Sequence, residues 1–285
     1  MSEVFVSPQP QARQGAVLPS LFISHGSPDT VIARTPANAF LRDVASSLPR
    51  PKAIVVVSAH FELPDLVGVT ADAAPETIHD FGGFQQELYE MQYPAPGAPE
   101  LAEQISADLA AQGFTARTLV ERGFDHGVWV PLILMYPEAD IPVVVVSVDP
   151  QGGPEHHLRL GRALAKLARE DVLVVGSGSF THNLPEAFVN VRQGARDAAV
   201  PAWAQEFADW MCERISAADL DALLAYRDRA PHASRNHPTD EHLMPLFVAM
   251  GVAGDRFAAT QLHRSDEFGV LSMAMWRFDP APAER

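Results

Sequence analysis

The chain has 285 residues, of which 47% are hydrophobic and 20% are charged, a composition that excludes a largely disordered protein. Lys and Arg number 21 against 36 Asp and Glu, and the resulting net charge of −15 makes nucleic acid and anionic membranes poor partners. The single cysteine, Cys212, cannot form an internal disulfide or a thiolate metal cage. No apolar run approaches the ~20 residues that span a bilayer, and the N-terminus lacks a signal-peptide pattern. We therefore expect a soluble, cytoplasmic protein.

In chain order, short runs rich in Val and Ile alternate with amphipathic stretches. Tails are expected at residues 1–16 and 280–285, with one domain over 17–279. Strands are predicted over 17–24, 53–59, 66–70, 141–148, 172–177, 257–263 and 270–278. Helices are predicted over 98–112, 154–169, 200–215 and 238–250. This alternation indicates a single α/β domain with a central mixed β-sheet flanked by helices.

The positions of the histidines carry the functional information, because the chain has 11 of them. His25, His60 and His182 each follow a predicted strand, and ligands of open α/β sheets bind at the carboxyl ends of strands. His126 and His237 lie in loops before apolar segments. With cysteine nearly absent, a metal site here would use imidazole and carboxylate ligands, which suit iron, zinc or manganese.

For any one histidine, a hydrogen-bonded structural role is the more common alternative. We assign no functional role to six of them; His242 is the least secure of these, because it lies five residues after His237 and could line the same cleft. His156 and His157, at the start of a predicted helix, are expected to be solvated. The six are His79, His156, His157, His232, His242 and His263.

Other catalytic motifs are missing from the sequence. The segment from Gly176 to Gly178 lacks the third glycine of a dinucleotide fingerprint, and no GxxxxGK[ST] phosphate loop occurs. No GxSxG nucleophile elbow and no HExxH helix occur either. Serine hydrolases and nucleotide-dependent enzymes are therefore poorly supported.

Six segments together resemble the class III, LigB-like extradiol ring-cleavage dioxygenases, DOPA-dioxygenase type, over residues 17–275. They are SHGSP (24–28), SAHFE (58–62), HDFGGFQQELYEMQYPAPG (79–97), DHGVWVPL (125–132), GSGSFTHNL (176–184) and NHPTDEHLMPL (236–246). The resemblance implies the LigB-like fold and a non-haem Fe(II) enzyme that opens a catechol ring with O2 to give a semialdehyde. We also expect a monomer or small homo-oligomer.

Carried over residue by residue, the resemblance implies that His25, His60 and His237 bind the metal. It implies that His182 is the catalytic base, close enough to the metal that it could be a fourth ligand, and that His126 contacts the substrate. Zn(II) could occupy the same site in purified protein. The alternatives left open are a non-catalytic metal-binding relative and a zinc-dependent hydrolase.

A carboxylate-bearing catechol such as DOPA or caffeate would be repelled by the acidic surface unless cations lie near the cleft. Arg122 and Arg235, close in sequence to His126 and His237, are the candidates, although both could equally be ordinary surface arginines.

Overall fold

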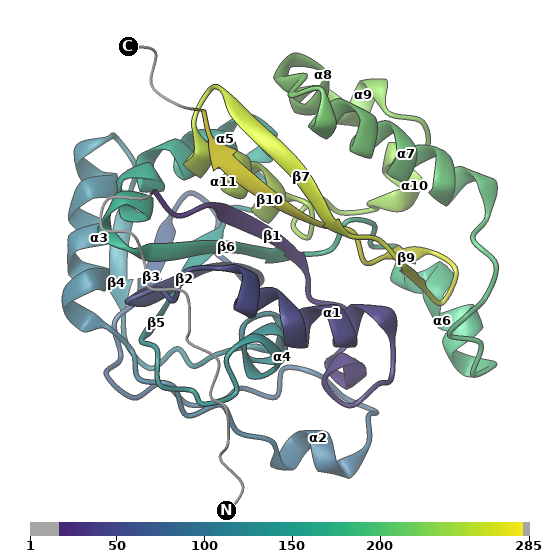
Figure 1. Cartoon of the computed structure of the whole chain (residues 1–285), viewed down its shortest axis with the longest axis horizontal. Helices are drawn as coiled ribbons and strands as arrows, with labels where there is room; N and C mark the ends of the chain where they lie inside the picture. The colour runs from purple at the N-terminus through teal and green to yellow at the C-terminus, as the bar shows by residue number, and fades with distance from the viewer. Residues whose placement is uncertain (1–16, 282–285) are drawn as a thin grey trace, which may run out of the picture.

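The computed structural model describes residues 17–281 and is built on an eight-stranded sheet with the strand order β4-β3-β5-β2-β6-β1-β10-β7 (Figure 1). The four central strands β5, β2, β6 and β1 are parallel, whereas β3 pairs antiparallel with β5, and β10 antiparallel with β1. The expected mixed sheet is confirmed. The strands of this sheet are β1 (Ser20–Ser24), β2 (Ala53–Glu62), β3 (Val67–Thr70), β4 (Ala116–Leu119), β5 (Val143–Val148), β6 (Val172–Gly178), β7 (Phe257–His263) and β10 (Met275–Pro280).

Helices cover both faces of the sheet. α11 packs on α5 and against β6 and β1, while α4 and α1 pack together on the opposite face (Figure 1). The α-helices are α1 (Pro36–Val44), α2 (Gln86–Glu90), α3 (Pro99–Ala111), α4 (His126–Met135), α5 (Gly153–Leu164), α6 (Leu184–Arg192), α7 (Ala202–Ser216), α8 (Leu220–Leu224), α9 (Tyr226–Arg229), α10 (Ala233–Asn236) and α11 (Met244–Ala253). Three short 3-10 helices lie at Pro28–Val31, Ala45–Ser47 and Ala165–Glu170.

The sequence of α11 explains its central position. All ten of its residues are buried, as expected for a helix that is apolar on every side. It crosses α5 closely because both helices carry glycine at the contact: a Cβ added to Gly161 would lie 2.1 Å from the Val248 carbonyl oxygen. Any larger side chain there would force the two helices apart.

Two differences from the predicted elements matter for the site. The predicted helix over 238–250 begins later, at Met244, so the segment before it is a turn. The predicted strand over 270–278 is divided, because Leu271–Ser272 (β9) pairs with Asp266–Glu267 (β8) in a separate hairpin and β10 begins at Met275. Of the expected tails, 1–16 and 282–285 lie outside the described residues, and Pro280 belongs to β10.

The carboxyl ends of three neighbouring strands are level at one edge of the sheet. Ser24 of β1 pairs with Gly178 of β6, and Ser58 of β2 pairs with Ser177 of β6. The chain segments that leave these strands therefore start from adjacent points, as the sequence predicted.

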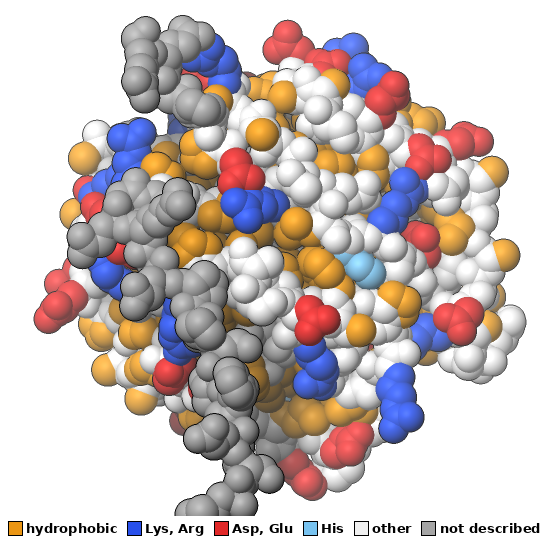
Figure 2. Space-filling model, viewed as in Figure 1, with side chains coloured by type: hydrophobic (Ala, Val, Ile, Leu, Met, Phe, Trp, Pro, Cys, Tyr) orange, Lys and Arg blue, Asp and Glu red, His pale blue; other side chains and the backbone are white. Residues whose placement is uncertain are grey.

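Charged side chains of both signs are interspersed over the face shown in Figure 2. None of the helices within residues 17–281 combines the length and the apolar character needed to cross a membrane.

His157, expected to be solvated, is fully buried instead. Its Nδ1 donates to the Gly153 carbonyl and its Nε2 accepts from the Asp149 backbone N–H. Burial lowers the pKa of His157 to about 4, from an ordinary value of 6.5. Below pH 6.5 the unfolded chain binds a proton that the folded chain excludes, so this histidine stabilises the fold above pH 6.5 and its contribution is lost as pH falls toward 4.

We expect His157→Gln to weaken the loss of stability on acidification between pH 6.5 and pH 4. One histidine that takes up a proton only on unfolding changes the free energy of unfolding by at most about 1.4 kcal/mol per pH unit. Urea unfolding at several pH values measures the slope, and His232→Gln, at an exposed position, is the control. An unchanged slope in the His157 variant would show that this ring does not titrate with folding.

Candidate metal centre and active site

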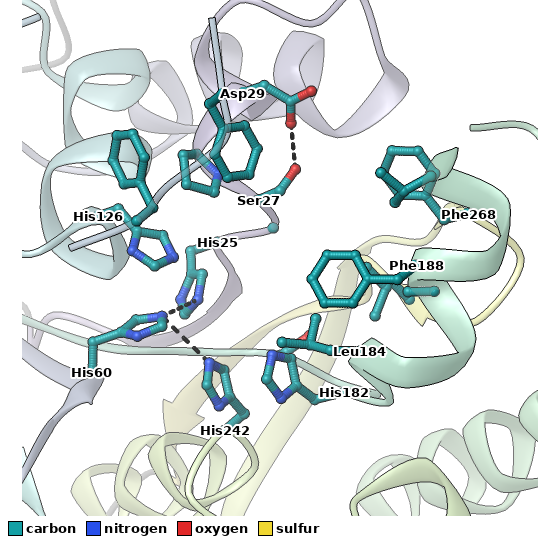
Figure 3. Close-up of a pocket in the computed structure, with 18 of the residues that line it drawn as sticks. His25, Ser27, Asp29, His60, His126, His182, Leu184, Phe188, His242 and Phe268 are labelled. Carbon is teal, nitrogen blue, oxygen red and sulfur yellow. Dashed lines mark hydrogen bonds between the residues drawn. The ribbon is translucent and has the colours of Figure 1, made fainter. Parts of the chain in front are cut away.

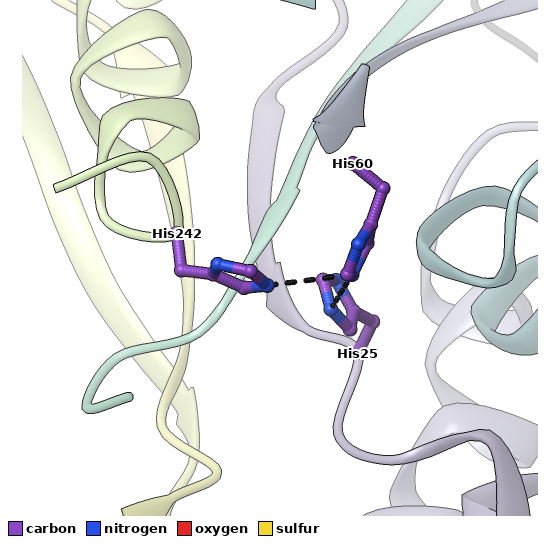
Figure 4. A group of neighbouring side chains, drawn as sticks. All are labelled: His25, His60 and His242. Carbon is purple, nitrogen blue, oxygen red and sulfur yellow. Dashed lines mark hydrogen bonds between the residues drawn. The ribbon is translucent and has the colours of Figure 1, made fainter. Parts of the chain in front are cut away.

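Three imidazole rings meet at the carboxyl edge of the sheet (Figure 4). The Nε2 atom of His60 lies 3.1 Å from Nε2 of His25 and 3.3 Å from Nε2 of His242. These three residues form a group whose candidate ligand atoms all lie within 4.8 Å of one another. The rings come from three separate parts of the chain, and only the fold brings them together.

The backbone positions each ring in a different way. His25 directly follows β1, and its N–H donates to the Gly178 carbonyl of β6. His60 lies inside β2, where the pairing with β5 shifts register between Ser58 and Glu62. His242 lies in the turn before α11, and its carbonyl accepts from the N–H of Ser179, just past β6. All three are thus tied to neighbouring strand ends.

The outer nitrogens of two rings have partners that fix their tautomers. The Ser177 hydroxyl donates to the Gly127 carbonyl, so His25 Nδ1, 3.0 Å from that hydroxyl, must be the donor of their hydrogen bond. His242 Nδ1 lies 2.7 Å from a carboxylate oxygen of Glu241 and donates to it. With the hydrogen on Nδ1, the Nε2 atoms of both rings carry lone pairs directed at the cluster.

The three rings are uncharged at neutral pH. Burial, reinforced by the neighbouring histidines, holds the pKa of His25 and of His242 well below the usual range. Burial and the adjacent His126 lower the pKa of His60 to about 3. Neutral imidazole is the form that binds metal ions.

This arrangement fits a metal ion. Converging lone pairs on neutral rings repel one another unless a cation lies between them. Nitrogen atoms bound tetrahedrally at ~2.0–2.1 Å would be about 3.3 Å apart, close to the 3.1 and 3.3 Å separations here. His25, His60 and His242 could therefore hold one divalent ion and leave positions open toward the cavity.

His237, the expected third ligand, is not part of this cluster, and that expectation is corrected by the geometry. Its ring is fully buried beside Phe207, and its Nε2 donates to the Phe180 carbonyl. It belongs to none of the candidate metal groups found among the described residues. The third member of the cluster is His242, which the sequence analysis left as the least secure structural histidine.

His126, the expected substrate contact, is placed beside the cluster by Asp80. Both the backbone N–H and the Nδ1 of His126 bond to one Asp80 oxygen, at 2.9 and 3.0 Å. The other Asp80 oxygen lies 3.7 Å from Nδ1 of His60. Although burial alone would raise it, these hydrogen bonds lower the pKa of Asp80 to about 2, so the carboxylate stays charged. Sequence reasoning missed Asp80, although it lies in the motif at residues 79–97.

His182, the expected base, stacks on His242 with ring centroids 3.5 Å apart. Its Nδ1 is 3.9 Å from the Glu241 carboxylate that His242 also contacts. His182 shares a candidate group with Glu241 and His242, but not with His25 and His60.

A cavity of about 390 Å³ opens beside the rings, and all five of these histidines line it (Figure 3). The lining histidines are His25, His60, His126, His182 and His242. The rest of the wall is largely apolar and includes Phe81, Phe84, Leu184, Phe188, Phe268 and Met273. A site with a few converging polar groups in an apolar cleft is typical of small-molecule binding.

Comparison with known proteins shows the family of the chain. Residues 19–275 match the model of the catalytic LigB subunit of aromatic ring-opening dioxygenase. The chain belongs to the LigB family. It is 42% identical to a 4,5-DOPA dioxygenase extradiol from Beta vulgaris, covering 91% of this chain and 96% of the relative. It is 38% identical to one from Escherichia coli K12, covering 90% and 93%.

The same fold has been solved. The crystal structure of an uncharacterized Escherichia coli K12 protein matches with a TM-score of 0.73 and 32% identity, over 91% of this chain and 99% of that one. As a LigB-family member this chain is an aromatic ring-opening dioxygenase of the DOPA-dioxygenase type, as the sequence resemblance implied.

We expect Asp80→Asn to weaken metal binding by about 10–100-fold, the usual cost of losing a group that supports metal ligands. The amide would still accept from the His126 N–H but would lose the negative charge beside His60. Titration of the metal-free protein with Zn(II) measures the affinity. Asp140→Asn, at an exposed ion pair with Arg50, is the control. Equal affinities in the wild type and the Asp80 variant would exclude this supporting role.

Proposed function

We propose that this protein is an Fe(II)-dependent extradiol dioxygenase that opens the ring of a catechol with O2. The observation that carries the proposal is the set of Nε2 atoms of His25, His60 and His242, which lie 3.1 and 3.3 Å apart along the rim of an apolar cavity. His242 replaces His237 in the ligand set that we propose.

Bound Fe(II) would acidify a catechol hydroxyl and exchange electrons with O2, which Zn(II), having no redox chemistry, cannot do. Three neutral imidazoles leave the full charge of the ion uncompensated within the ligand set. They also leave coordination positions for the two adjacent oxygens of a catechol and for O2.

We assign His182 as the base for the second catechol hydroxyl and later as the acid for ring opening. Burial lowers the pKa of His182 to about 4, below the near-neutral value that suits a base in water. The ring is consequently neutral before substrate binds and can accept a proton. Negative charge developing on the substrate oxygen would raise its pKa at the moment of transfer.

We assign His126 as a hydrogen-bond donor to the substrate oxygens. The Asp80 carboxylate accepts a hydrogen bond from Nδ1 of His126, so Nδ1 carries a hydrogen. Nε2 lies on the other side of the ring, away from Asp80, and is the nitrogen left free to contact a substrate oxygen in the cavity. Asp80 therefore holds the His126 ring in place for contact with the substrate.

An oxygen electrode tests the proposal. The metal-free protein is loaded anaerobically with Fe(II) or Zn(II), then mixed with catechol and air-saturated buffer. Oxygen uptake with a yellow semialdehyde absorbance is expected for the Fe(II) sample alone. Hydrolysis of an ester with Zn(II) and no oxygen uptake would indicate a zinc hydrolase, and absence of both reactions would indicate a non-catalytic metal-binding relative.

A further inference from the structure

We propose, resting on the function proposed above, that the preferred catechol carries an uncharged, apolar ring substituent rather than a carboxylate. The 4,5-DOPA dioxygenases named above act, by their names, on an amino acid. The wall of this cavity points to a different class of substituent.

The side of the cavity away from the metal cluster is apolar. Figure 3 shows Leu184, Phe188 and Phe268 facing the cavity across from His25 and His60. Leu184 and Phe188 lie on α6 and are 38% and 48% exposed, so they meet the solvent at the cavity mouth. A catechol whose oxygens are held at the histidines would direct its substituent toward this wall. Burying apolar surface there is favourable, and burying a charge is not.

The charged groups of the lining are acidic. Among the described residues that line the cavity there is no Lys or Arg, whereas Asp29 and Asp80 are present. The Asp80 carboxylate lies beside His60 and His126, 3.7 and 3.0 Å from their Nδ1 atoms. Away from the metal cluster, a substrate carboxylate would therefore find no Lys or Arg among the described lining residues to pair with, and the net charge of −15 on the whole chain would oppose it as well.

The arginine that contacts Asp29 and Phe268 of the cavity lining is already engaged. Arg196 pairs with both Asp29 and Glu267 and lies over the Phe268 ring. With two carboxylates to one guanidinium, this group leaves no positive charge to offer a ligand.

The two arginines singled out from the sequence are engaged as well. Arg122 donates to Asp125 and to the His60 carbonyl, with its guanidinium over Phe61. Arg235 pairs with Glu186 at 2.6 Å and lies over Trp203. Neither lines the cavity.

Anaerobic calorimetry of the Fe(II)-loaded protein tests the proposal with two probes of matched shape. They are 4-(3-methylbutyl)catechol and 3-(3,4-dihydroxyphenyl)propanoate, in which two methyl groups replace two carboxylate oxygens. We expect the neutral catechol to bind at least about tenfold more tightly, because the carboxylate would lose hydration without a partner. Equal or tighter binding of the carboxylate overturns the proposal, and so does the absence of binding by both probes.

A charge placed on the wall should reverse the preference. We expect Phe188→Arg to tighten binding of the carboxylate and weaken binding of the neutral catechol, so that the affinity ratio falls by about tenfold. Val189→Arg is the matched control, because Val189 is 44% exposed on the same helix and does not line the cavity. Equal shifts in the two variants would mean that the general field of the protein, and not the wall, sets the preference, and would overturn the proposal.

Measuring binding and ring opening separately distinguishes failure of this inference from failure of the proposed dioxygenase function. Tighter binding of the neutral probe without ring opening in air would leave the ligand class standing and refute the dioxygenase proposal. Ring opening of both probes with tighter binding of the carboxylate would support the dioxygenase proposal and refute the proposed ligand class.

Discussion

Replacing His242 by alanine should abolish stoichiometric metal binding and reduce the rate of ring opening more than ~100-fold. Loss of a residue that only supports a metal ligand costs up to ~100-fold, and loss of a ligand should cost more. The reason is geometric: its Nε2 is one of three that converge in the cluster, 3.3 Å from Nε2 of His60. Metal analysis after Fe(II) loading and gel filtration, together with oxygen uptake, measures both effects. Circular dichroism checks that the variant is folded.

His237→Gln is the matched test, since five positions separate the two histidines and their expected roles are opposite. Glutamine can still donate to the Phe180 carbonyl but does not fill the space of the buried ring, so the variant should fold with reduced stability. Because His237 is not in the cluster, the variant should keep one metal ion per chain. Loss of metal in this variant, with full metal in His242→Ala, would restore His237 as the ligand and refute the geometry.

Replacing His182 by phenylalanine should leave the metal in place and lower turnover by about 10²–10⁴, the usual contribution of acid–base assistance. Phenylalanine retains a planar ring to stack on His242, where the centroids are 3.5 Å apart, but cannot move a proton. Iron content and the steady-state rate with catechol are the measurements.

The control for this variant is His263→Phe. His263 also stacks on an aromatic ring, that of Phe40, but does not line the cavity. Its turnover should match the wild type. A wild-type rate in His182→Phe would remove His182 from the mechanism, whereas loss of iron would identify it as a fourth metal ligand.

Much of the fold could be predicted from local sequence. The Val-rich runs of β2, β5 and β6 are continuous because helices cover both faces of the sheet, and that pattern is visible without a structure. Strands β4 and β8 could not be predicted in this way. β4 has no buried residue, and β8 is two residues long, so neither carries a hydrophobic period.

The sequence analysis took His237 as the third ligand from the family resemblance, and it placed His242 inside a predicted helix. Pro238 and Pro245 can each occupy the first turn of a helix, and the sequence analysis started the helix at Pro238. The helix starts at Met244 with Pro245 in its first turn, so His242 lies in the preceding turn and reaches the cluster. The choice between the two prolines depends on tertiary packing.

The role of Asp80 could not be predicted from a local sequence pattern. Asp80 supports His60 and His126 from 20 and 46 positions away in the chain, and their relation exists only in the folded molecule. Four of the five cavity histidines, in contrast, were expected at the site from the sequence, because they lie in short motifs next to predicted elements, whereas His242 was given a structural role.

Anomalous diffraction at the iron edge from crystals of anaerobically Fe(II)-loaded protein tests the central claim most directly. We expect one peak within bonding distance of Nε2 of His25, His60 and His242, at ~2.0–2.2 Å from each. A peak bound by His237, or one held by His60, Asp80 and His126 with His242 remote from it, would contradict the account.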